Sequence, residues 1–189
     1  MGRHAAVLCA LAVAFAAPDV ADARPASKGW FAEGGLGAVN FLPPRASRGA
    51  AIGPSLGVRI GRDLFSWLSL NVHVAASSHE ATVPPPPEGE WFQLYRGAAD
   101  LRLTGRFDRI ALYVEGGAGL VMISSNVLGK LMITDPGEEF GLMFGGGGGV
   151  EYQLENRHYS IGVGVDAFFV PQFAKMSGLD SRAFLRYTY

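Results

Sequence analysis

An alternation of apolar and polar side chains with a period of two constrains this chain more than any other feature. Side chains of a β-strand point alternately to opposite faces, so each alternating segment predicts a strand whose two faces meet different surroundings. No run of about 18 apolar residues follows residue 23, and no transmembrane helix is expected. The chain is therefore predicted to be all-β, with eight strands at residues 30–39, 52–61, 68–77, 95–104, 110–122, 140–153, 159–168 and 182–189.

Residues 1–23 have the organisation of a secretory signal peptide. A short basic start that contains Arg3 is followed by the apolar run 5–17 and by the small-x-small sequence Ala21-Asp22-Ala23. The run is shorter than the roughly 20 residues that a membrane-spanning helix needs. Cleavage would leave residues 24–189 as one domain and would remove Cys9, the only cysteine, so the exported protein is expected to form no disulfide.

Short and long connections alternate between the predicted strands. Short connections with turn-forming residues are expected near 61–66, 105–109 and 155–158, and long ones near 40–50, 77–91, 124–138 and 170–180. An even number of antiparallel strands with this alternation is typical of an eight-stranded up-and-down transmembrane β-barrel, whose short turns face the periplasm and whose long loops face outside.

Charge indicates which face of each strand meets lipid. Large aliphatic side chains share one face, whereas charged side chains such as Arg96, Asp100 and Arg102 share the other. With the apolar face outward, the barrel avoids about 2–4 kcal/mol for each Arg or Lys at the bilayer midplane. This arrangement also accounts for a charged fraction of only 17%. The net charge of −1 argues against a nucleic-acid-binding protein.

The inward face combines glycines with ionisable side chains. An eight-stranded barrel is just wide enough to be filled by side chains, so inward glycines are expected to make room for arginine and aromatic side chains. Five acids and five arginines balance there, which predicts a buried ion-pair network. Its expected members are Glu33, Arg59, Arg96, Asp100, Arg102, Glu115, Glu151, Asp166, Arg182 and Arg186. A narrow polar pore lined by the same residues is the alternative.

Aromatic side chains gather near the ends of the predicted strands, where the girdles of membrane barrels are expected. Packing between strand ends would give the same distribution. The expected members are Trp30, Trp67, Trp91, Phe92, Tyr95, Tyr152, Tyr159, Tyr187 and Tyr189.

The whole pattern resembles the small eight-stranded outer-membrane barrels of the OmpA membrane domain, OmpX and opacity-like type. The most specific element is the end of the chain, residues 184–189, which alternates and closes on an aromatic residue. The resemblance implies that Tyr187 and Tyr189 form the signal read by the barrel-assembly machinery, although a terminal Phe is commoner in that family. It also implies a Gram-negative-type outer membrane as the location and outer-membrane lipid as the surroundings.

Motifs for cofactors and metals are weak. Residues 162–167 fit the dinucleotide fingerprint, and five glycines occur at 145–149, but neither precedes a helix, as phosphate binding would require. The histidines His73, His79 and His158 have no metal-ligand spacing. No cofactor and no metal are expected.

One enzymatic alternative rests on His158 and Ser160, because outer-membrane lipid A deacylases of the PagL type use a His-x-Ser pair with a carboxylate. His158 would be the base and Ser160 the nucleophile, with Asp166 as the nearest carboxylate. The residues that follow Ser160 differ from that family, and His158 is expected in a periplasmic turn, away from the outer leaflet. The non-enzymatic interpretation is preferred.

The long loops are the remaining place for function, because loops on a rigid scaffold commonly carry binding. Pro84 to Pro87 predict a stiff segment in loop 77–91, for which a protease-resistant spacer is the alternative to a binding element. Residues 127–133 are unusually apolar for an exposed loop, which suits packing over the barrel mouth, strands that continue beyond the membrane or contact with a partner. The chain is therefore expected to be a non-enzymatic envelope scaffold whose loops 77–91 and 124–138 contact an extracellular or envelope protein.

Overall fold

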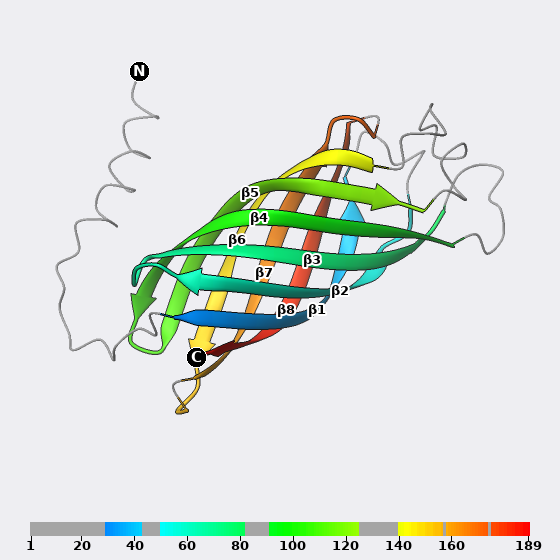
Figure 1. Ribbon diagram of the computed structural model, residues 1–189. Coiled ribbons are helices and arrows are strands. Elements are labelled where there is room, and N and C mark those ends of the chain that lie inside the picture. The colour runs from blue at the N-terminus through cyan, green and yellow to red at the C-terminus, as the bar shows by residue number, and fades with distance from the viewer. Residues whose placement is uncertain (1–28, 43–49, 82–90, 125–139, 157, 174) are drawn as a thin grey trace, which may run out of the picture.

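The eight predicted strands are present and form one closed antiparallel barrel (Figure 1). The computed structural model describes residues 29–42, 50–81, 91–124, 140–156, 158–173 and 175–189. The strands are β1 (Trp30–Phe41), β2 (Gly53–Asp63), β3 (Leu68–Glu80), β4 (Trp91–Phe107), β5 (Ile110–Ile123), β6 (Phe140–Gln153), β7 (Tyr159–Val170) and β8 (Met176–Thr188). Within these ranges no helix is long and apolar enough to cross a membrane.

Each strand pairs with its neighbours in sequence, and β8 closes the barrel against β1. The closing register runs from Phe31 opposite Thr188 to Phe41 opposite Gly178. The tightest connection is the two-residue turn 108–109, where Phe107 pairs with Ile110. Asp108 adopts a left-handed φ of 52°, which aspartate tolerates better than most residues. An up-and-down barrel leaves no free sheet edge.

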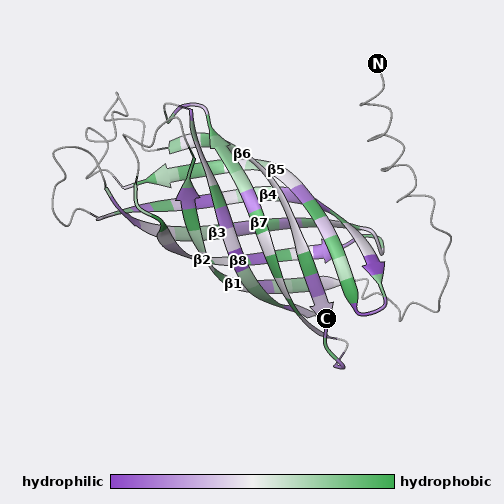
Figure 2. Cartoon of the chain, turned by 180° about the vertical axis from the view of Figure 1, so that it is seen from behind, coloured by the Kyte–Doolittle hydropathy of each residue, from purple (hydrophilic) through white to green (hydrophobic). Residues whose placement is uncertain are grey.

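The two faces of the wall differ as the alternation predicts. Outward aliphatic side chains such as Leu56, Val72, Val114 and Val163 are more than half exposed, whereas inward Arg59 and Arg102 are almost fully buried. Figure 2 shows the same contrast as alternating green and purple segments along the strands. The barrel is therefore apolar outside and polar through most of its interior, the reverse of a water-soluble barrel.

Several strands are longer than predicted. β4 extends from 91 to 107 rather than from 95 to 104, β3 continues to Glu80, and β8 begins at Met176. The predicted loops 77–91 and 170–180 are therefore partly strand. The predicted signal peptide, Pro84–Pro87 and residues 127–133 lie outside the described residues.

The predicted aromatic girdle is wrong at one of its members. Phe92 points inward and is 1% exposed, because it has the parity of Leu94 and Arg96 and packs with apolar side chains in the lumen. Trp30, Trp67, Trp91 and Tyr189 are at least half exposed and lie near strand ends.

Candidate functional site

The middle of the lumen is organised around Glu115 of β5. Its carboxylate accepts hydrogen bonds from three arginines on three other strands: Arg59 of β2, Arg102 of β4 (2.8 Å) and Arg182 of β8 (2.9 Å). The Glu115 side chain is only 3% exposed. Three guanidinium groups thus compensate the cost of removing one carboxylate from water.

Arg102 and Arg182 extend this network to the neighbouring strands. Arg102, whose side chain is fully buried, also donates to Glu33 of β1 at 3.2 Å. Arg182 forms an ion pair with Asp166 of β7. The network therefore joins both sides of the β1–β8 seam to the opposite wall of the barrel.

A second cluster fills the end of the lumen near the short turns. Arg186 donates to both carboxylate oxygens of Asp63, at 2.8 and 2.6 Å, and its guanidinium lies 3.8 Å from the centre of the Phe31 ring. Ser69 Oγ donates to Asp63 at 2.5 Å. A single guanidinium nitrogen thus contacts both oxygens of the carboxylate, and the charges on the two partners make these hydrogen bonds stronger than neutral ones.

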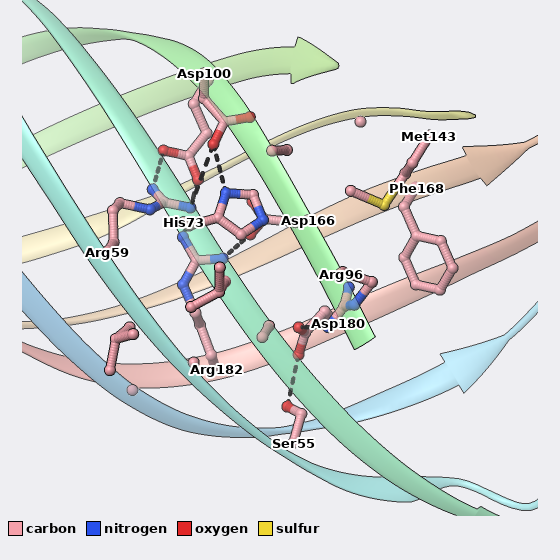
Figure 3. A pocket seen from close by; sticks show the side chains of 18 of the residues that line it. Ser55, Arg59, His73, Arg96, Asp100, Met143, Asp166, Phe168, Asp180 and Arg182 are labelled. Carbon is pink, nitrogen blue, oxygen red and sulfur yellow. Dashed lines mark hydrogen bonds and ion pairs between the residues drawn. The ribbon is translucent and has the colours of Figure 1, made fainter. Parts of the chain in front are cut away.

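A third cluster lies toward the long connections. Asp180 of β8 accepts hydrogen bonds from Arg96 of β4 and from Ser55 Oγ of β2, the latter at 2.9 Å. The Arg96 guanidinium also lies 4.8 Å from the centre of the Phe168 ring. Figure 3 shows these groups from close by.

An apolar plug closes the lumen beyond Arg96. Its ten buried members come from strands and connections around the barrel: Val39, Ala81, Phe92, Leu94, Val121, Ile123, Met143, Phe168, Val170 and Phe173. Phe173 belongs to the connection between β7 and β8 and is 2% exposed. This connection is folded back by a hydrogen bond from the Met176 N–H to the Phe173 carbonyl, 2.9 Å. Among the described residues the mouth is therefore filled mainly by apolar side chains, and the buried His79 ring packs against Phe92 beside them.

A cavity of about 60 Å³, lined by charged as well as apolar side chains, remains below the plug. His73 and Asp100 face it, with His73 Nδ1 2.6 Å from an Asp100 carboxylate oxygen, and Arg59 lies 3.9 Å from the same carboxylate. Asp166 and Arg182 line another part of it (Figure 3). At roughly 10–15 Å³ for each water, the cavity has room for a few water molecules.

Inward glycines accommodate large side chains of other strands. Tyr113 of β5 lies across β6 and β7, where a Cβ at Gly149 would come within 2.6 Å of its hydroxyl and one at Gly164 would overlap it. A Cβ at Gly162 would overlap the Phe184 ring. The predicted role of these glycines is confirmed for aromatic partners. Arginine is not the partner at these sites, since the guanidinium of Arg102 stacks 4.2 Å from the Tyr113 ring centre instead.

All ten predicted lumen residues lie inside the barrel. Seven of them belong to the Glu115 network, two belong to the Asp63 cluster, and one belongs to the third cluster. Ion pairs in the middle of the lumen bring together Glu33, Arg59, Arg102, Glu115, Asp166 and Arg182, with Asp100 beside Arg59. Arg186 and Glu151, 3.6 Å apart, lie in the cluster near the short turns, and Arg96 lies in the third cluster.

Three inward charges were missed by sequence reasoning. Asp63 and Asp180 lie just beyond the predicted strand ends, and Arg106 lies in the predicted turn 105–109. Continuing the alternation by two residues from Gly61 and from Arg182 would have placed both aspartates inward. The described lumen thus holds seven carboxylates and six arginines, together with His73 and His79, rather than five of each.

The terminal tyrosines lie on the outer side of β8 at the short-turn end. Tyr187 contacts the rings of Tyr159 and Tyr189, with centroid separations of 4.9 and 4.8 Å. Tyr189 is 70% exposed. The last residues of the chain therefore present an aromatic surface beside the β1–β8 closure.

His158 and Ser160 do not form a catalytic pair in this structure. Ser160 Oγ donates to Glu151 at 2.6 Å, whereas His158 Nδ1 bonds to the Thr188 carbonyl at 2.8 Å. No hydrogen bond joins His158 to Ser160 among the described contacts. The prediction of Asp166 as the carboxylate of this pair is also wrong. Asp166 pairs with Arg182, and the carboxylate next to Ser160 is that of Glu151. In the described part of the chain, no group of three or more His, Cys, Asp or Glu side chains is placed to hold a metal ion.

Comparisons with known proteins agree with this architecture. Residues 6–174 match the family model of the outer membrane protein beta-barrel domain. A comparison with curated protein sequences gave no match.

Three solved structures share the fold at low sequence identity. Neisserial surface protein A is 15% identical with a TM-score of 0.65, over 85% of this chain and 97% of that one. OprG from Pseudomonas aeruginosa is 12% identical with a TM-score of 0.58, over 86% and 97% of the two chains. Ail, the attachment invasion locus protein of Yersinia pestis, is 11% identical with a TM-score of 0.54, over 86% and 99%. The family match over most of the chain shows that it belongs to the outer membrane protein beta-barrel domain family and resides in the outer membrane of a Gram-negative-type bacterium, and the apolar outer wall and the shared fold agree with this.

Proposed function

We propose that this protein is a non-enzymatic scaffold of the outer membrane, whose closed barrel holds the long connections at the cell surface, where they bind a partner. The observation that carries the proposal is the filled lumen. Beneath the apolar plug, each of the three ionic clusters joins side chains from at least two strands.

A filled lumen disfavours the pore alternative. A hydrated solute entering from the long-connection end would meet Phe92, Phe168 and Phe173, none of which can replace its lost hydrogen bonds with water. Deeper in the lumen it would have to separate the buried contacts of Glu115 with its arginines. Both barriers argue against steady conduction.

A rigid lumen suits a scaffold, because binding loops work best on a support that does not move. Connections 77–91 and 124–138 join strands whose lumen ends are fixed in the plug by Phe92, Leu94, Val121 and Ile123. The expected partner is an extracellular or envelope protein. Assembly of the barrel is expected to use the barrel-assembly machinery, with Tyr187 and Tyr189 as its recognition signal.

Site-specific crosslinking in cells tests the binding role. A photo-reactive amino acid at Pro87 or Lys130 should give a discrete adduct with a protein partner, whereas the same group at Glu155, an exposed residue at the opposite end of the barrel, should not give that adduct. Absence of an adduct from both loops would remove the binding role.

Two further measurements separate the alternatives. Purified protein in planar bilayers should give no discrete conductance steps, and such steps would establish a pore. Acyl-chain release from lipopolysaccharide that is lost in Ser160→Ala would establish the hydrolase instead.

A further inference from the structure

The outer wall of the barrel is hollowed on one side. A groove of about 480 Å³ crosses β2 to β6. Small outward residues, Ala76 and Gly97, lie in it, and larger side chains surround them: Leu56, Tyr95, Met122 and Phe140. Strand pairing places Leu56, Ala76, Tyr95, Met122 and Phe140 in one row across the five strands, and the next row places Gly97 between Val74 and Leu120.

The groove lies at the boundary of the apolar band toward the long connections. The next outward row is polar, because Ser78 pairs with Gln93, whose N–H donates to Ser124 Oγ at 3.1 Å. Tyr95 and Phe140 therefore lie where an aromatic girdle is expected, and the groove continues from them toward the middle of the wall.

We propose that this groove binds an acyl chain of lipid A in the outer leaflet. The groove is continuous with the lipid-facing wall that the family assignment establishes, and the outward-facing side chains that line it are apolar except for the Tyr95 hydroxyl. A flexible hydrocarbon chain can follow a curved groove. It then provides the dispersion contacts that the lining side chains would lose if the groove stayed empty. The outer leaflet follows from the predicted orientation, with the long connections outside the cell.

A second barrel is a poorer occupant. Its wall is convex and stiff, so it would span the depression and leave the space over Gly97 unfilled. A soluble polar ligand is poorer still, because the lining offers one hydroxyl for hydrogen bonding. Lipid binding on the wall of the barrel does not depend on partner binding by the loops.

Filling the groove from within tests the proposal. A Cβ at Gly97 would meet only Val74 Cγ1 at 3.7 Å and the His73 carbonyl at 3.8 Å, which are ordinary contacts, so Gly97→Leu should assemble and project its side chain into the groove. Gly34→Leu is the matched control, because Gly34 also faces outward, on β1, and a Cβ there would meet nothing within 4 Å. Ala76→Leu fills the same groove if Gly97→Leu does not assemble.

Native mass spectrometry of protein extracted in a mild detergent gives the readout, after removal of lipid and titration with lipid A or with phosphatidylethanolamine. Wild type and Gly34→Leu should each retain one lipid A molecule that Gly97→Leu loses. Equal retention by all three proteins, no retention by wild type, or retention of phosphatidylethanolamine in preference to lipid A would overturn the proposal. So would a wild-type dimer that Gly97→Leu converts to monomer, because the occupant would then be a second copy of the chain.

Discussion

Single residues show how closely this lumen is packed, and Gly164 offers a direct test. A Cβ at Gly164 would overlap the hydroxyl of Tyr113, a buried group with no hydrogen-bond partner among the described residues. Gly164→Ala should therefore destabilise the barrel by about 1–3 kcal/mol, as overpacked cores do. Tyr113→Phe should restore most of that loss, since it removes the clashing atom and leaves no donor unsatisfied. The measurement is the temperature at which the folded band on unboiled gels converts to the unfolded one.

The control for this pair is Gly34→Ala, which adds the same methyl group to the outer wall, where nothing lies within 4 Å. It should leave the conversion temperature unchanged. An equal loss in Gly164→Ala with and without Tyr113→Phe would show that backbone strain, rather than the tyrosine hydroxyl, makes alanine unfavourable at position 164.

At the scale of the strands, Glu115 determines how β2, β4, β5 and β8 are held across the lumen. Glu115→Gln keeps the shape of the side chain but leaves Arg59, Arg102 and Arg182 without the carboxylate that they share. Breaking a buried ion pair by removing one partner costs about 3–5 kcal/mol, so the unfolding midpoint in urea should fall sharply. Glu155→Gln, in which an 89% exposed side chain loses a 3.8 Å pair with Arg109, should change it little. Similar midpoints for the two variants would contradict a structural role for the network.

The connection between β7 and β8 makes a separate contribution by inserting Phe173 into the plug. Phe173→Ala should leave a void at the mouth and weaken the adjoining ends of β7 and β8. Hydrogen exchange should become faster near Val170 and Met176, whereas the end that holds Asp63 and Arg186 should keep its protection. Uniformly faster exchange along both strands would mean that the plug stabilises the whole barrel rather than its mouth alone.

The strands themselves could be predicted because lipid outside and polar groups inside impose opposite demands on alternate residues. The prediction stopped short where that contrast fades. Toward the long connections the inward face becomes apolar while the outward face gains polar residues such as Ser78 and Gln93, so Phe92 was assigned to the girdle, and the inward-facing Leu94 and Val121 gave no signal of a plug. Asp63 and Asp180 were missed because they lie within the predicted connections 61–66 and 170–180. Which arginine meets which acid depends on the stagger of strands that are far apart in sequence, as in the pair of Arg96 and Asp180, and alternation carries no information about stagger.

For the whole molecule, the decisive property is its orientation in the membrane, because the proposed scaffold needs the long connections outside the cell. Lys175 is exposed at the long-connection end and Glu155 at the short-turn end. The only native cysteine, Cys9, lies in the predicted signal peptide, so Lys175→Cys and Glu155→Cys should each give a mature protein with a single thiol. In intact cells a membrane-impermeant maleimide should label Lys175→Cys and not Glu155→Cys, and after the outer membrane is permeabilised it should label both. The reverse order of labelling would place the long connections in the periplasm, where they could bind only a periplasmic partner and where the groove at Gly97 would face the inner leaflet.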